Sequence, residues 1–196
     1  MLGKNLKEQL AVIIASWGYT GFIPSFAKED MGGTWGSLFA TPVCFAYLWA
    51  CRSASILPDG SADHMGMITR YAFILIYVYF LGRLSIGLAE KVIGPRVWKG
   101  KVRNHYQNQI VIDEAWGMFI TYYSIFLGFS NVALFSWQMI IILILGFGYF
   151  RIFDIMKFWP VKIFDRKQSP FGVMMDDGVT GIQAGVLLHL TAWLIF

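Results

Sequence analysis

Long apolar stretches, separated by shorter polar segments, dominate the chain. A helix needs about 20 predominantly apolar residues to cross a hydrocarbon core of about 30 Å. The third stretch is short for a membrane span, so we expect it to be tilted, re-entrant or partly interfacial. The pattern predicts an all-α, polytopic membrane helix bundle with about five apolar spans. The five stretches occupy residues 37–52, 69–90, 115–129, 132–150 and 178–196.

A shorter helix is expected before the first span. Residues 4–17 (KNLKEQLAVIIASW) join a charged start to a brief apolar run, which predicts an N-terminal interfacial helix. The apolar core is short for a signal peptide, and no small-x-small cleavage site follows cleanly. A Gly-rich polar stretch comes next, at 18–37. We therefore expect a single integral membrane domain over 1–196, with the helix and Gly-rich segment in 1–36 and the helical bundle in 37–196.

Composition supports a membrane protein and argues against a nucleic-acid-binding one. Hydrophobic residues make up 57% of the 196 residues and charged residues only 14%, whereas soluble domains usually carry about a quarter charged residues. The net charge of +4 comes from basic residues that flank the apolar spans instead of forming one solvated face. Cys44 and Cys51 are seven positions apart in one apolar helix, about 10 Å along its axis, which is too far for a disulfide.

The distribution of basic residues orients the spans. Lysines and arginines concentrate in the N-terminal stretch and in segments 91–103 and 151–167. Five spans with the N-terminus in the cytoplasm satisfy the positive-inside rule. This topology places every acidic residue that borders an apolar span from the third onward on the cytoplasmic side. These residues are Asp113, Glu114, Asp154, Asp165, Asp176 and Asp177.

Acidic residues at the ends of apolar helices indicate a cation site. Asp176 and Asp177 directly precede a stretch without formal charge, and ionised side chains cost several kcal/mol to place in hydrocarbon. Asp113, Glu114 and Asp154 stand at similar boundaries. Carboxylate ligands without cysteine or paired histidine favour a hard ion, Mg²⁺ before Ca²⁺ or Mn²⁺. We predict that these five acids converge on Mg²⁺, and that Asp113, Glu114, Asp154 and Asp177 are catalytic.

Cations beside these acids suit a phosphate group. Arg151, Lys157 and Arg166 interleave with Asp154 and Asp165 in the run RIFDIMKFWPVKIFDRK. Helical spacing places Arg151, Asp154 and Lys157 on one face, so they are either intrahelical ion pairs at an interface or part of a phosphate-and-metal site. The whole run favours the second interpretation.

A Gly-rich segment is a further candidate for phosphate binding. In GGTWGS, Thr34 or Ser37 can cap the helix that begins there, and free amides at a helix N-terminus suit a phosphate. A plain helix-capping signal is the alternative. We include Thr34 and Ser37 with Arg151, Lys157 and Arg166 as predicted substrate-binding residues.

The same motifs resemble a known family. RIFDIMKFWPVKIFDRK followed by FGVMMDDGVTG is similar to the C-terminal signature of the phosphatidylglycerophosphatase A family, and VIDEAWG, GFIP and GGTWGS resemble its earlier elements. The chain departs from the family pattern at Phe158, where proline is usual, and at Thr180, where alanine is usual. Residues that carry the resemblance include Gly21, Pro24, Gly33, Thr34, Gly36, Ser37, Asp113, Glu114, Gly117, Arg151, Asp154, Lys157, Pro160, Asp165, Arg166, Gly172, Met174, Asp176, Asp177 and Gly181.

The resemblance implies a Mg²⁺-dependent phosphatase that converts phosphatidylglycerophosphate to phosphatidylglycerol and phosphate at the cytoplasmic face of a bacterial inner membrane. The expected partners are this substrate and membrane lipids. No serine, cysteine or histidine stands in a nucleophile arrangement, which favours direct attack by water, with an aspartyl-phosphate intermediate as the alternative. Two other functions stay open: a phosphatase for another lipid or isoprenoid phosphate, and a non-enzymatic cation-binding membrane protein or transporter. The absence of Asp and Glu from the span centres counts against a transporter.

Overall fold

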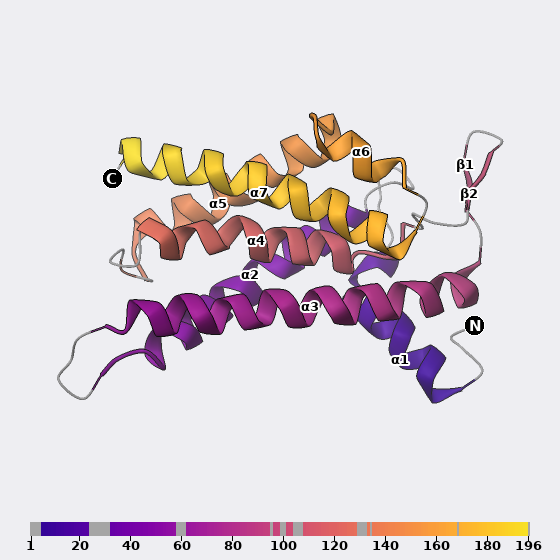
Figure 1. Ribbon diagram of the computed structural model, residues 1–196, viewed down its shortest axis with the longest axis horizontal. Helices are drawn as coiled ribbons and strands as arrows, with labels where there is room; N and C mark the ends of the chain where they lie inside the picture. The colour runs from indigo at the N-terminus through magenta and orange to yellow at the C-terminus, as the bar shows by residue number, and fades with distance from the viewer. Residues whose placement is uncertain are drawn as a thin grey trace.

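Five long helices lie alongside one another and form the body of the protein (Figure 1). The computed structural model describes residues 5–23, 32–57, 62–94, 96–98, 101–103, 108–128, 133, 135–167 and 169–195. The long helices are α2 (Gly32–Ser53), α3 (His64–Ile93), α4 (Ile112–Gly128), α5 (Trp137–Met156) and α7 (Pro170–Ile195). The shorter elements are α1 (Leu6–Ala15), a 3-10 turn (Thr20–Phe22), α6 (Val161–Asp165) and the strands β1 (Arg96–Trp98) and β2 (Lys101–Arg103).

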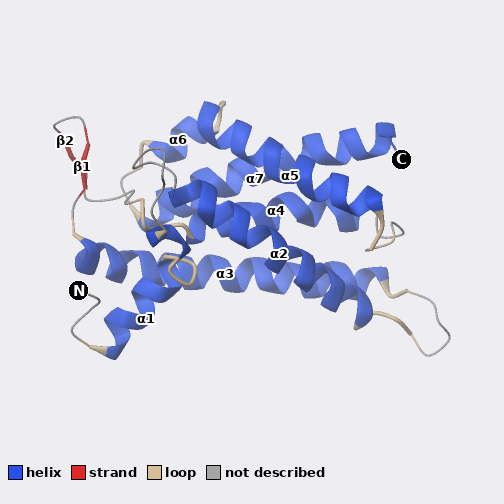
Figure 2. Cartoon of the chain, turned by 180° about the vertical axis from the view of Figure 1, so that it is seen from behind, coloured by secondary structure: helices blue, strands red, loops and turns tan. Residues whose placement is uncertain are grey.

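The all-α class predicted from the sequence is confirmed, with one small addition. Each of the five apolar stretches corresponds to one long helix, and α1 matches the expected N-terminal helix. The addition is an antiparallel pairing of β1 with β2, in which Arg96 lies opposite Arg103 (Figure 2). Among the described residues, α3, α5 and α7 are long and apolar enough to cross a membrane. The count of five spans stays a prediction.

Four helices begin earlier than predicted, α2, α3, α4 and α7, and the starts of α2 and α7 bear on the acidic residues and the Gly-rich motif. The first span was expected from residue 37, but α2 begins at Gly32; the last was expected from residue 178, but α7 begins at Pro170. Proline suits the first position of a helix because its missing N–H would be unpaired there in any case. The early start of α7 moves Asp176 and Asp177 from the mouth of the helix into its second turn.

Local sequence fixes several of the helix ends. Asp63 and Ser136 cap α3 and α5, because their side-chain oxygens accept hydrogen bonds from the backbone N–H groups of Gly66 (2.8 Å) and Met139 (3.3 Å). At its other end α5 stops at Lys157, whose backbone is left-handed with φ of 44°. This turn directs the chain into α6, which returns it to α7.

Glycines allow α4 and α7 to pack with their backbones in close contact. A Cβ on Gly181 would lie 2.4 Å from the Gly117 carbonyl oxygen, and one on Gly178 would lie 2.2 Å from the Trp116 ring. Trp116 also donates a hydrogen bond of 2.8 Å to the Leu75 carbonyl, which ties α4 to α3. These small residues therefore form a helix–helix contact. It holds the N-terminal halves of α4 and α7 together.

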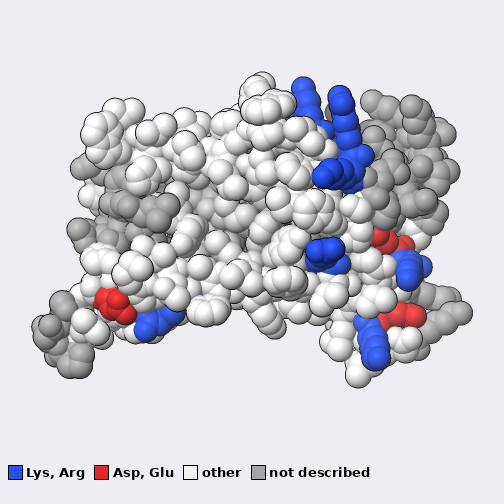
Figure 3. Space-filling view, viewed as in Figure 1, with Lys and Arg blue, Asp and Glu red and all other residues white. Residues whose placement is uncertain are grey.

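The outer surface of the long helices is apolar. Large side chains such as Phe73, Leu84, Ile144 and Trp193 are each more than 60% exposed. Extended apolar surface of this kind marks contact with lipid or with another apolar partner. Figure 3 shows the charged side chains gathered mainly towards the end of the bundle that carries α1 and α6. The apolar surface and the charged end define a membrane-type helix bundle with one polar end.

Candidate metal and phosphate site

Four of the helix termini at one end of the bundle carry predicted site residues. The helices α2, α4 and α7 begin there, and α5 ends there (Figure 1). Each of these termini carries residues that the sequence proposed for the site. The expectation that the acids would converge on one end of the bundle is therefore met.

Three carboxylates form the tightest part of the site. Asp113 and Glu114 lie in the first turn of α4, and Asp177 lies in the second turn of α7. One oxygen from each side chain lies within 4.8 Å of the other two. Asp113 and Asp177 are 7% and 4% exposed, so these negative charges are shielded from water. Three acids packed this closely repel one another unless a cation or protons compensate.

The unsatisfied oxygen atoms of this cluster fit a metal ion. Among the described residues, Asp113 Oδ1 and Glu114 Oε2 are buried and accept no hydrogen bond. Buried polar atoms are nearly always paired, because an unpaired one loses its hydration without compensation. Burial, followed by the charge of Glu114, raises the pKa of the Asp113 carboxyl well above its ordinary value. A divalent cation bound by these oxygens would offset both costs.

The first turn of α2 closes one side of the cluster. A Cβ on Gly33 would lie 2.3 Å from Glu114 Oε1 and 3.3 Å from Arg151 Nη1. Only a glycine leaves room there for the carboxylate and the guanidinium together. Gly33 therefore brings the backbone of α2 against the site, as its Gly-rich motif suggested.

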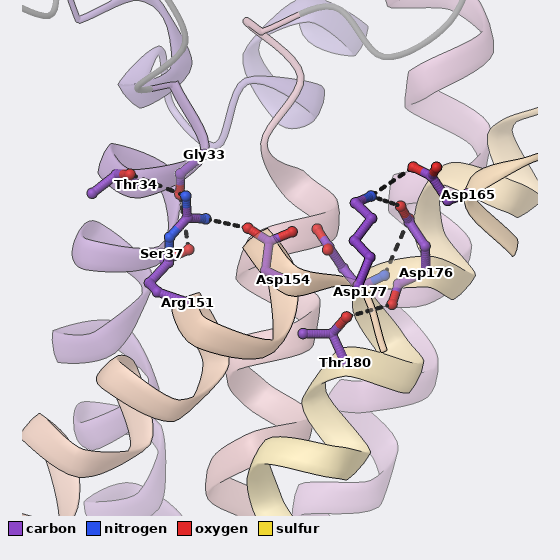
Figure 4. A network of polar contacts seen from close by, with 10 residues as sticks. Gly33, Thr34, Ser37, Arg151, Asp154, Asp165, Asp176, Asp177 and Thr180 are labelled. Carbon is purple, nitrogen blue, oxygen red and sulfur yellow. Dashed lines mark hydrogen bonds and ion pairs between the residues drawn. The ribbon is translucent and has the colours of Figure 1, made fainter. Parts of the chain in front are cut away.

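Arg151 links α5 to α2. Its Nη1 contacts Asp154 Oδ2 at 2.6 Å, and its Nη2 donates to Thr34 Oγ1 at 3.1 Å (Figure 4). Both arms of one planar guanidinium are thus engaged by two different helices. The ion pair between Arg151 and Asp154 confirms that they share a face of α5.

The predicted capping role of Thr34 and Ser37 is wrong. Because α2 begins at Gly32, both residues lie inside the helix. Thr34 accepts the hydrogen bond from Arg151, whereas the buried Ser37 donates to the Gly33 carbonyl at 2.8 Å. Thr34 is therefore part of the site's polar network, and Ser37 stabilises the first turns of α2.

Lys157 connects the α5–α6 turn to α7. Its Nζ lies 2.7 Å from Asp165 Oδ1 and 2.7 Å from Asp176 Oδ2. The sequence predicted that Lys157 would share a helical face with Asp154. This prediction is wrong, because α5 ends at Met156. Burial alone would lower the pKa of the Lys157 ammonium, but the charges of Asp176 and Asp177 outweigh it and raise the pKa. Lys157 is therefore a fixed positive charge beside the acidic cluster.

The two remaining predicted metal ligands lie next to the tight cluster and are paired with cations. Asp154 pairs with Arg151 and Asp176 with Lys157. In Figure 4 the Asp177 side chain lies beside Asp154, between Asp154 and Asp176. The structure thus brings together all five predicted acids and separates them into an inner group of three and a paired outer group of two.

Two further residues of the sequence motif differ in their placement. Asp165, which was not among the predicted site residues, contacts Lys157 and so supports the site indirectly. Arg166 is the C-cap of α6; its side chain is exposed and makes no ion pair or hydrogen bond within the described residues. Pro24, which contributed to the family resemblance, lies outside the described residues.

Fold and site together define a membrane-type helix bundle with a buried carboxylate cluster and two adjacent cations. The family model of phosphatidylglycerophosphatase A matches residues 13–192. The chain belongs to this family. The match covers every residue of the site described above.

Individual relatives match over shorter segments. The chain is 34% identical to phosphatidylglycerophosphatase A of Haemophilus influenzae over 46% of its own length and 51% of that protein. It is 39% identical to phosphatidylglycerophosphatase A of Escherichia coli over 44% of its own length and 45% of that protein. A Bacteroides thetaiotaomicron protein, provisionally named as a phosphatidylinositol-3-phosphatase, is 31% identical over 45% of this chain. The chain thus spans about half the length of the curated relatives it matches. No solved structure matches it.

Proposed function

We propose that this protein is a Mg²⁺-dependent phosphatase that hydrolyses the terminal phosphate of phosphatidylglycerophosphate to give phosphatidylglycerol and inorganic phosphate. The observation that carries the proposal is the cluster of Asp113, Glu114 and Asp177, with its unpaired buried oxygens, beside the cations Arg151 and Lys157. Carboxylates for a hard cation and cations for a phosphate are the two parts that metal-assisted phosphate hydrolysis requires.

The inner carboxylates would hold the metal. Mg²⁺ is commonly bound by one or two carboxylates together with waters and substrate phosphate oxygens. Asp113, Glu114 and Asp177 supply such oxygens from two helices whose separation is fixed by glycine contacts. When bound, the ion would neutralise phosphoryl oxygens and lower the pKa of a water molecule.

The cations would neutralise the phosphomonoester. In Figure 4 Arg151 lies on one side of the Asp154–Asp177 pair, and Asp165 and Asp176, the ion-pair partners of Lys157, lie on the other. A dianionic phosphate placed between them would receive hydrogen bonds from both sides. Both cations are already oriented by carboxylates, so little side-chain entropy is lost when substrate arrives.

The hydrolytic step needs a proton acceptor for the attacking water. Asp154 lies outside the inner cluster but beside Asp177, which suits it to this role. Water attacks phosphorus and loses a proton to Asp154. The bond between phosphorus and the glycerol oxygen breaks, and this oxygen takes up the proton that Asp154 received, which gives phosphatidylglycerol and restores the carboxylate.

The site's position suits a lipid substrate. It lies at one end of a bundle whose sides are apolar, so a lipid could present its headgroup while its acyl chains stay in the bilayer. We propose that this end faces the cytoplasm of a bacterial inner membrane, as the positive-inside rule indicates.

A lipid-phosphate panel tests the proposal. Purified protein in neutral detergent is incubated with phosphatidylglycerophosphate, phosphatidic acid, phosphatidylinositol-3-phosphate or an isoprenoid phosphate, with Mg²⁺ or with EDTA. We expect phosphate release to be fastest from phosphatidylglycerophosphate and to stop in EDTA. Faster release from another lipid would show that the proposed substrate is wrong and that the proposed phosphatase activity is right. No release from any of them with Mg²⁺ would favour a cation-binding protein.

A further inference from the structure

Arg83 is a charged residue on the outer, apolar face of α3. Its side chain is exposed, and its neighbours Phe80 and Leu84 are 54% and 70% exposed. A charge on the lipid-facing side of an apolar helix is costly unless something compensates it. The position of Arg83 along the bundle indicates which group can compensate its charge.

Contacts between α3 and α7 place Arg83 at the level of the acidic site. A Cβ on Gly82 would lie 2.6 Å from Met174 Sδ, and one on Gly87 would lie 3.7 Å from Pro170. Arg83 is therefore level with the first two turns of α7, the turns that carry Asp176 and Asp177. Helix α3 continues for another ten residues, about 15 Å, beyond it. If the acidic site meets lipid headgroups, Arg83 meets them too.

The Phe171 ring contacts both Arg83 and a second cation, Lys167. The Arg83 guanidinium carbon lies 5.8 Å from the centre of the Phe171 ring, and Lys167 Nζ lies 5.4 Å from the same centre. Lys167 Nζ is also 5.3 Å from the Phe164 ring centre. Cation–π contacts orient these side chains. Figure 3 shows basic side chains gathered over this end of the same face.

We propose that Arg83 and Lys167, arranged around Phe171, bind the phosphodiester group of an anionic membrane phospholipid. A phosphate oxyanion satisfies two neighbouring cations, and a guanidinium can bind it bidentately. The exposed apolar residues beside Arg83 would contact the acyl chains of the same lipid. The site differs from the carboxylate cluster, because it lies where α7 meets α3 and the cluster lies where α7 meets α4. Binding there does not depend on the proposed reaction.

Lipid binding without catalysis tests the proposal. The full chain in neutral detergent is titrated with short-chain phosphatidylglycerol or with phosphatidylcholine of the same acyl chains, in EDTA, and binding is followed by calorimetry. Without a metal ion the carboxylate cluster repels anions, so binding that persists in EDTA reports on another site. We expect phosphatidylglycerol to bind more tightly than phosphatidylcholine. Arg83→Gln should weaken phosphatidylglycerol binding about fivefold, the usual contribution of one basic residue near an anionic lipid surface.

Matched variants identify the residues responsible. Arg83→Lys keeps the charge and should retain most of the affinity, whereas Phe171→Leu should weaken binding by releasing both cations. Lys91→Gln, which removes an exposed charge from the last turn of the same helix, should have little effect. Equal binding by Arg83→Gln and wild type, or an equal loss in Lys91→Gln, would overturn the proposal. Displacement of the lipid by equimolar inorganic phosphate would also overturn it, because the site would then recognise free phosphate.

Discussion

The two ends of the helix bundle are built from the same apolar helices but use their polar residues differently. At the end opposite the site, Asp63 caps α3 and Ser136 caps α5, and Arg70 donates to Ser55. These groups complete helix ends and connect helices. At the site end, the buried oxygens Asp113 Oδ1 and Glu114 Oε2 have no hydrogen-bond partner among the described residues.

The difference shows where this fold has been arranged for something other than stability. A polar group that caps a helix contributes about 1 kcal/mol, whereas buried like charges cost stability until a ligand compensates them. Replacing a carboxylate at the site end should therefore keep the fold and abolish function. Removing a capping group at the other end should lower stability and keep function.

Asp177→Asn gives the largest expected effect. Asparagine keeps the volume and removes one of three crowded charges, so metal binding should fail and phosphate release should drop at least about a hundredfold. The melting temperature without metal should not fall, because repulsion within the cluster is relieved. Mg²⁺ should raise the melting temperature of the wild type, as any ligand of the folded state does, and should not raise that of the variant.

The matched control is at the other end of the bundle. Asp63→Asn keeps an acceptable N-cap on α3, so activity and the Mg²⁺-dependent rise in melting temperature should both match the wild type. If Asp177→Asn keeps its response to Mg²⁺, the inner carboxylates are not the metal ligands.

Gly181→Ala tests the packing that positions the cluster. The added Cβ would lie 2.4 Å from the Gly117 carbonyl oxygen, so α4 and α7 must move apart. We expect a loss of about 1–3 kcal/mol in the free energy of unfolding, with a fall in activity as Asp113 separates from Asp177. The measurement is denaturant unfolding together with phosphate release.

A second glycine provides the control for helix propensity. Gly148 on α5 has open space around its Cβ position. Gly148→Ala should therefore keep full activity and gain up to about 1 kcal/mol, since alanine favours a helix more than glycine does. Equal behaviour of the two variants would mean that the close contact at Gly181 does not position the site.

Much of this architecture could be predicted from the sequence, because its signals are local. The five apolar stretches correspond to five long helices. The positive-inside pattern predicted that the acidic residues bordering the later spans lie on one side, and they lie at one end of the bundle. The Arg151–Asp154 pair follows from helical spacing alone. Local residue types and periodicity were sufficient for these features.

Other features depend on contacts between distant segments, which a single sequence does not contain. The local sequence does not show that Asp113 and Glu114 belong to the inner cluster and Asp154 does not. This depends on the approach of α4 to α7. The partners of Lys157 were missed because its left-handed backbone ends α5 one residue earlier than helical spacing assumes. The start of α7 at Pro170 was missed although Ser169 and Pro170 are a local start signal, because the span was placed by its apolar run, which begins only after Asp177.

Arg151→Lys should have a smaller effect than Asp177→Asn or Gly181→Ala. Lysine keeps the charge but cannot contact Asp154 and Thr34 with the two arms of a planar group. We expect kcat/KM to fall about tenfold, through KM if Arg151 contacts phosphate in the ground state and through kcat if it does so only in the transition state. Mg²⁺ affinity without substrate should change little. Arg70→Lys, at the other end of α3, should leave these constants unaltered; unchanged kinetics in Arg151→Lys would make Arg151 only an ion-pair partner of Asp154.

The last pair of variants tests the orientation of the bundle in the membrane and should leave activity intact. Met65 at the start of α3, away from the site, is 71% exposed, and Trp159 in the α5–α6 turn, which follows the end of α5 at the site, is 78% exposed. Each is replaced by cysteine in turn. Cys44 and Cys51 can stay in place, because they are 0% and 3% exposed and should not react with a membrane-impermeant thiol reagent. In sealed inside-out bacterial vesicles, Trp159→Cys should label and Met65→Cys should label only after the vesicles are opened. The wild type gives the background. Labelling of both variants from the same side would show that the bundle does not cross the membrane in the proposed orientation, whereas the reverse sidedness would place the carboxylate site outside the cytoplasm and contradict the positive-inside prediction.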